Sequence, residues 1–132
     1  MPRALWPLRH DQPVVRIRLA LGAGGRPVAR HLLADTGAGT SRAGFELLLM
    51  ENDCLSCGGI PSLAVVLGGA YVGTFPTYLV RVRVPEVGFD HYVQAVGLRT
   101  GPGGFDGIAG FRFLNRFTYG NFGDPDQFGI EN

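Results

Sequence analysis

The stretch LLADTGAGTSRAG, residues Leu32–Gly44, sets one carboxylate between an apolar segment and a run of small residues. That carboxylate, Asp35, is costly to bury at the end of an apolar strand unless neighbouring groups hydrogen-bond it. The glycines that follow leave room for backbone N–H groups to turn toward it, and Thr36 adds a hydroxyl. The stretch therefore predicts a strand that delivers a rigidly held carboxylate to a loop. A plain Asx turn, common where Asp precedes Gly by two positions, is the other interpretation.

Length and composition predict one folded domain that spans residues 1–132. Hydrophobic residues make up 45% of the chain and charged residues 17%, which is typical of a folded protein and not of a disordered one. The 21 glycines and 9 prolines follow no repeat, so they indicate many tight turns between short strands.

The charge distribution argues against two classes of partner. Every one of the 12 basic residues is arginine, they are scattered along the chain, and the net charge is only +1, so we expect no nucleic-acid partner. No apolar run approaches the roughly 20 residues of a membrane span, so we expect no membrane partner. The first ten residues lack the apolar core of a signal peptide, which makes a cytoplasmic location the expectation.

Alternating hydrophobicity predicts a mostly β protein. Residues 13–21 and 77–84 alternate apolar side chains with arginine, as half-buried strands do. Other strands are expected at 28–34, 62–67 and 91–98, and a short closing strand is expected after a turn at 124–126. The spacing of Phe45, Leu48 and Leu49 predicts a short amphipathic helix, and a second short helix is expected around Phe113 and Phe117.

The two cysteines, Cys54 and Cys57, form a lone CxxC motif. Structural zinc needs about four ligands, and no histidine lies near this motif in the sequence. The Gly-Gly-Ile-Pro that follows argues against the helix of a redox motif. We therefore expect both cysteines in a loop, able to pair only under oxidation, with no metal site.

A second motif, FDGIAGFRFL, follows about 70 residues after Asp35. Together with the Asp-Thr-Gly-Ala of residues 35–38, it resembles the retropepsin-like aspartic proteases. In that family one apolar strand ends in Asp-Thr/Ser-Gly-Ala, and a second ends in two apolar residues and Gly before a short helix. The resemblance covers residues 14–117. It implies a closed β-barrel-like retropepsin fold with one or two short helices, one lobe per chain, in which the second strand threads the aspartate loop.

The resemblance also implies roles for particular residues. Asp35 would be the catalytic aspartate, supported by Thr36, Gly37 and Ala38, and Gly39 would contact the substrate backbone. The second motif, Ile108, Ala109 and Gly110, would pack beneath the aspartate loop. A Gly-rich hairpin, the flap, would cover the substrate, and its expected tip is at Gly58, Gly59 and Ile60.

The family's chemistry requires two carboxylates that share one proton, because like charges about 3 Å apart cannot both ionise. This chain has no second Asp-Thr/Ser-Gly: Asp106 belongs to the second motif, and Asp124 and Asp126 lie in a predicted turn. The expectation is therefore a homodimeric aspartic endopeptidase that cleaves a peptide or protein with water and needs no cofactor. The family's interface sheet implies roles for residues 128–132 and for the first strand.

Two other functions remain open at this point. The chain could be a catalytically silent retropepsin-like domain that binds peptides or only dimerises. It could also be a β-barrel binding module in which Asp35 does no more than cap a turn.

Overall fold

The computed structural model describes all residues, 1–132, and is built mainly from strands. The mostly β prediction with two short α-helices is confirmed, and neither helix is long and apolar enough to cross a membrane. The elements are β1 (Arg3–Pro7), β2 (Val14–Leu21), β3 (Arg26–Ala34), β4 (Leu47–Met50), α1 (Glu51–Ser56), β5 (Ile60–Leu67), β6 (Gly73–Val84), the 3-10 turn η1 (Pro85–Val87), β7 (Phe89–Leu98), β8 (Gly107–Ala109), α2 (Phe111–Leu114), β9 (Thr118–Gly120) and β10 (Gln127–Glu131).

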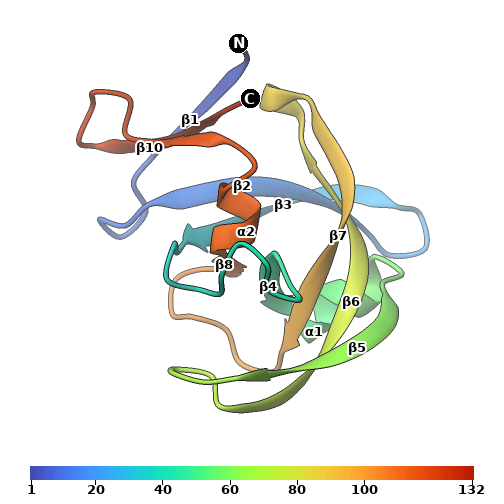
Figure 1. Cartoon of the computed structure of the whole chain (residues 1–132). Helices are drawn as coiled ribbons and strands as arrows, with labels where there is room; N and C mark the ends of the chain where they lie inside the picture. The colour runs from blue at the N-terminus through green and yellow to red at the C-terminus, as the bar shows by residue number, and fades with distance from the viewer.

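Six of the strands close into a β-barrel (Figure 1). The larger sheet has the order β2-β3-β8-β4-β7-β6-β5, and β2 also pairs with β6 through Arg18 and Arg83, which closes the ring. β5 lies outside the ring and pairs only with β6, so the two strands form an arm that extends below the loop that follows β3 (Figure 1). The predicted barrel is therefore confirmed, with one hairpin added to it.

The barrel walls follow the predicted alternation of side chains. In β2, Val15, Ile17 and Leu19 are buried, whereas the arginines between them are only partly buried. β6 repeats the pattern with Val80, Val82 and Val84 inside. Because successive side chains of a strand point to opposite faces, one face of each strand supplies the core and the other meets solvent.

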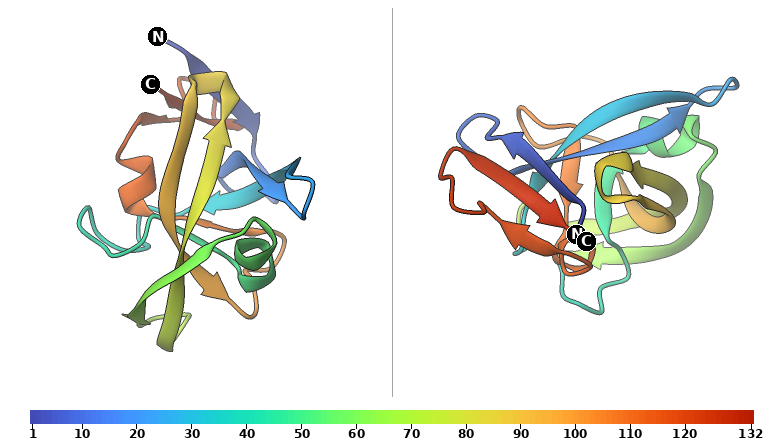
Figure 2. Two further views of the ribbon diagram at one scale, coloured as in Figure 1. Left: turned by 90° about the vertical axis from the view of Figure 1, so that its right-hand side faces the viewer. Right: turned by 90° about the horizontal axis from the view of Figure 1, so that it is seen from above.

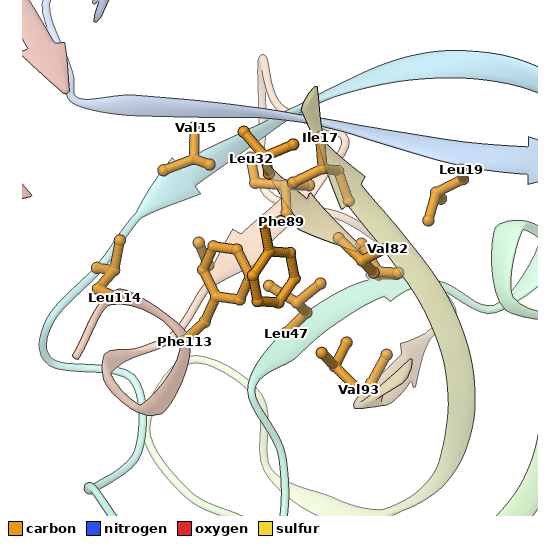
Figure 3. Close-up of a cluster of buried hydrophobic side chains, with 14 of the residues drawn as sticks. Val15, Ile17, Leu19, Leu32, Leu47, Val82, Phe89, Val93, Phe113 and Leu114 are labelled. Atoms are coloured by element: carbon orange, nitrogen blue, oxygen red, sulfur yellow. The ribbon is translucent and has the colours of Figure 1, made fainter. Parts of the chain in front are cut away.

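The core is centred on three phenylalanine rings. Phe89, Phe113 and Phe117 lie in mutual contact, with ring centroids 5.5 Å apart in each pair. Phe113 comes from α2 and is fully buried among aliphatic side chains of β2, β3, β4, β6 and β7 (Figure 3). The short helix α2 thus plugs one side of the barrel.

The chain ends form a second, three-stranded sheet of order β1-β10-β9. Ala4, Trp6 and Ile130 from this sheet are buried in the main core, and the two termini lie side by side (Figure 2). Neither β1 nor β9 is among the strands that the sequence pattern predicts. Since β10 has a neighbour at each edge, the free edges of this sheet belong to β1 and β9.

The helix predicted from Phe45, Leu48 and Leu49 is wrong, because residues 47–50 form the strand β4. β4 runs between β7 and β8, so both of its faces are covered and residues 45–49 are all buried. A continuous apolar run of this kind fits a helical spacing only by coincidence. The helix α1 follows instead, and it includes Cys54, so the loop predicted there is also wrong.

We expect Phe113→Ala to lower the free energy of unfolding by about 3–5 kcal/mol, because it opens a cavity among three rings. Chemical denaturation monitored by circular dichroism measures the loss. Tyr92→Ala is the matched control, since Tyr92 is 63% exposed and its truncation removes little packing. Equal losses in the two variants would show that the core is not centred on Phe113.

Candidate functional site

Asp35 occupies the corner where β3 ends and its loop begins. β3 and β8 run parallel, with Ala34 opposite Ala109. The Asp35 N–H donates to the Ala109 carbonyl at 3.0 Å, which extends the pairing by one residue. The Ala38 N–H in turn donates to the Asp35 carbonyl at 3.1 Å. The backbone of the predicted catalytic residue is thus fixed on both sides.

The Asp35 carboxylate is held by the loop that follows it. The Gly37 N–H donates to its Oδ1 at 2.8 Å, which is the contact of an Asx turn. A Cβ at position 37 would lie 3.1 Å from that same oxygen, so glycine permits the close turn. Asp35 is half-buried while Thr36 and Gly37 are exposed. The Asp35 carboxylate is therefore held in place by the loop and can still be reached from solvent.

The second motif packs against this loop. Ile108 and Ala109 are buried in β8, and the Phe111 N–H donates to the Ala38 carbonyl at 2.9 Å. Gly110 sits at a close approach to the loop: a Cβ there would lie 2.9 Å from the Ala38 carbonyl oxygen and 3.0 Å from that of Glu46. Only glycine allows the chain segments to approach this closely.

An ion pair between a buried carboxylate and a partly exposed arginine joins the far end of the loop to the segment after α2. Glu46 is 3% exposed, and both of its carboxylate oxygens accept hydrogen bonds from Arg116. The same hydrogen bond to Glu46 raises the pKa of Arg116. Arg112 of α2 also donates to the Ala43 carbonyl at 2.8 Å. Hydrogen bonds from Arg112 and Arg116 therefore anchor residues 43–46, the segment through which the loop re-enters the barrel.

Asp35 lies in the wall of a pocket of about 390 Å³. The floor and sides come from the aspartate loop and its neighbours, and the opposite wall is the tip of the β5–β6 hairpin, which joins Leu67 to Gly73. Asp35 is the one carboxylate among the lining residues, most of which are apolar. They are Asp35, Gly37, Ala38, Gly39, Phe45, Leu48, Val66, Leu67, Gly68, Gly69, Ala70, Tyr71 and Ile108.

The predicted tip of the flap does not lie at this pocket. Gly58 and Gly59 join α1 to β5, and Ile60 is the first residue of β5 and is 65% exposed. The hairpin over Asp35 instead turns at Gly68 and Gly69. A signal for it was present, since residues 58–80 contain no charged side chain and these two glycines lie between two apolar runs.

The pocket walls include side chains that sequence reasoning missed. Phe45 and Leu48 were assigned to a helix, but they face the pocket from the loop return and β4. Leu67 and Tyr71 face it from the hairpin. Their positions in the sequence do not indicate a shared pocket, because the segments that supply them meet only in the folded chain.

The remaining acids and the cysteines lie outside this pocket. Asp106 accepts the His31 N–H at 2.8 Å, and its own N–H donates to the His31 carbonyl, so it ties β3 to the segment before β8. Cys54 and Cys57 are unpaired thiols, and burial raises the pKa of Cys54 to about 12. No group of three or more His, Cys, Asp or Glu side chains gathers where it could hold a metal ion.

Comparison with known proteins does not assign the chain to a family. No protein-family model matches it, and no solved structure matches it significantly. Support for a function therefore comes from three features of the structure: the Asp35 corner, the second motif, and the pocket between the loop and the hairpin.

We expect Gly110→Val to destabilise the fold by at least about 1–3 kcal/mol, because its Cβ would meet two carbonyl oxygens in a packed region. The melting temperature and a denaturant titration measure the effect. Gly103→Val is the matched control, since a Cβ at Gly103 meets nothing within 4 Å. An unchanged melting temperature in Gly110→Val would contradict the close packing of the second motif under the loop.

We expect Arg116→Met to lower the free energy of unfolding by about 1–3 kcal/mol, because the buried Glu46 carboxylate loses both of the hydrogen bonds that Arg116 donates. Arg81→Met is the control: it breaks a pair with Asp90 that lies on the exposed surface, and its loss should be smaller. Urea titration of both variants compares the two pairs, and equal effects would argue against an anchoring role for Arg116.

Proposed function

We propose that this chain is one subunit of a homodimeric aspartic endopeptidase, with one Asp35 from each subunit in a shared active site. The observation that carries the proposal is the half-buried Asp35 carboxylate in the wall of a largely apolar pocket, opposite a glycine-rich hairpin tip. The order of the motifs adds support, because the strand that bears Asp35 pairs directly with the strand of the second motif.

The chemistry follows from two carboxylates close together. Repulsion keeps one of them protonated while the other is ionised. The ionised carboxylate takes a proton from a water molecule as the water oxygen bonds to the peptide carbonyl carbon. The protonated carboxylate donates its proton to the carbonyl oxygen. Breakage of the C–N bond, with proton transfer to the leaving nitrogen, then releases a carboxylic acid and an amine.

The need for a second copy rests on the content of the pocket. Asp35 is its only carboxylate, so one chain alone cannot supply the pair. In a two-fold dimer the same surface of both subunits meets, and each contributes the same residue. The exposed Thr36 and Gly37 give a second copy access to the loop, and the absence of a Cβ at Gly37 lets the two loops come close.

The pocket walls indicate what the enzyme would accept. Phe45, Leu48 and Ile108 form an apolar surface next to the carboxylate, which favours an apolar side chain beside the scissile bond. The backbone of the hairpin tip can pair with an extended peptide, since Gly68 and Gly69 are exposed.

We expect Asp35→Asn to reduce peptide cleavage by about 10²–10⁴-fold, because it removes the acid–base group. Asparagine keeps an oxygen that can accept the Gly37 N–H, so the loop and the melting temperature should be preserved. Digestion of an unstructured peptide library between pH 4 and 7, read by mass spectrometry, measures cleavage in both proteins.

Asp35→Ala is the control for a structural role, because it removes both the acid and the acceptor for Gly37. A large fall in the melting temperature of Asp35→Ala alone, with cleavage unaffected in Asp35→Asn, would make Asp35 a turn cap. No cleavage by the folded, dimeric wild-type protein at any pH would favour a silent peptide-binding domain.

A further inference from the structure

A second pocket, of about 310 Å³, lies beside the first along β5. Its walls are residues 62–65 of β5, Gly44 of the loop, Thr77 of β6, Gln94 of β7 and Arg112 of α2. It shares none of the residues that line the Asp35 pocket. The proposed function assigns no role to this pocket.

An irregularity in β5 shapes this pocket. The pairing of β5 with β6 shifts in register between Pro61 and Ala64, which is the mark of a β-bulge. The Thr77 hydroxyl donates to the Leu63 carbonyl and fixes the bulged segment. Bulges of this kind re-aim side chains and often lie next to functional sites. Here the bulge leaves Leu63 81% exposed at the pocket rim.

Arg112 is the only charged side chain in the second pocket. It donates through one Nη to the Ala43 carbonyl, which holds it over the pocket, and its other N–H groups remain available. No carboxylate lies in the lining to neutralise it. The pocket therefore presents an uncompensated positive charge with a defined direction, which suits a carboxylate ligand.

Gln94 adds an amide with an unmet hydrogen-bonding requirement. Its Oε1 is shielded from solvent and has no hydrogen-bond partner. Buried polar atoms of this kind are rare in native proteins and need an explanation. An ionised carboxylate only accepts hydrogen bonds, so the group of Gln94 that can bind it is the Nε2 amide, which donates, and not Oε1. Arg112 and Gln94 together offer a carboxylate both a charge and a hydrogen bond.

The two pockets adjoin along one strand. Residues 62–65 of β5 line the second pocket, and Val66 and Leu67 continue directly into the Asp35 pocket. Within the second pocket Gly44 and Val65 lie close together, since a Cβ at Gly44 would lie 3.3 Å from the Val65 side chain. At about 3.3 Å per residue, an extended peptide along β5 spans the pockets in roughly four residues.

We infer that the second pocket binds an acidic side chain of the peptide substrate, about four residues from the apolar side chain in the Asp35 pocket. This inference rests on the proposed function, since it assigns a further specificity site to the same peptide. Arg112 binds the carboxylate, and Gln94 donates a hydrogen bond to it. The substrates are then peptides with an apolar residue at the cleavage site and Glu or Asp at a fixed distance along the chain.

Binding to full-length Asp35→Asn protein tests the inference without turnover. Fluorescence anisotropy compares labelled peptides that carry an apolar centre and a single Glu placed in turn at each position from two to six residues away on either side. Matched peptides carry Gln in place of that Glu. We expect one position at which Glu binds about five-fold more tightly than Gln, the size of effect that a single charge pair gives.

Substitution of the arginine completes the test. Arg112→Gln in the Asp35→Asn background should abolish the preference for Glu, so that the Glu and Gln peptides bind equally, and any loosening of residues 43–46 would weaken both peptides alike. Arg42→Gln is the matched control, since Arg42 is an exposed arginine of the loop between β3 and β4 that does not line the pocket, and it should keep the preference. The preference should also weaken as salt is raised from 0.05 to 0.5 M.

Three results would overturn the inference. The first is equal affinity for Glu and Gln at every position, and the second is a Glu preference that survives Arg112→Gln. The third is the failure of every peptide to bind. Cleavage of the Gln peptides by the wild-type protein tests the proposed function separately. If the peptides are cleaved without a Glu preference, only the acidic subsite is overturned. If no peptide is cleaved or bound, both the subsite and the proposed function are overturned.

Discussion

The pairing of β3 with β8 is the constraint on which the rest of the site depends. It places Asp35 directly after a largely half-buried strand, and the Ala109 carbonyl fixes the Asp35 N–H. On its other side β8 lies very close to β4, since a Cβ at Gly107 would lie 2.3 Å from the Leu48 carbonyl oxygen. The loop re-enters the barrel beside this crossing. The Glu46–Arg116 ion pair fixes it there, and the absence of a side chain at Gly110 leaves room for it.

This constraint separates two roles that lie close together in the chain. Glu46 is a buried acid that is fully committed to Arg116 and serves the fold. Asp35 is a half-buried acid that accepts one backbone N–H and faces a pocket. A carboxylate that is only partly satisfied at a rigid corner is suited to chemistry, because a substrate or a second carboxylate can reach it.

Much of the barrel was predictable because alternation in residues 13–21 and 77–84 reports directly on burial of one strand face. The second motif was predicted from the family resemblance alone, and the structure gives a physical reason for its glycine, which lies at a crowded crossing. The strand β4 could not be predicted from its sequence pattern, since burial on both of its faces removes the alternation of apolar and polar residues. The Gly-rich hairpin tip was predicted at Gly58 and Gly59 because residues 58–69 contain two Gly-Gly pairs, and only the tertiary structure shows that Gly68 and Gly69 are the pair that faces Asp35.

The central claim is that two copies of Asp35, from two chains, form one catalytic unit. The most direct measurement is the peptidase activity of dimers reassembled from wild-type and Asp35→Asn chains in varied proportions at constant total protein. If both carboxylates are required, activity falls as the square of the wild-type fraction. A linear fall would mean that each chain acts alone, and it would contradict the shared active site.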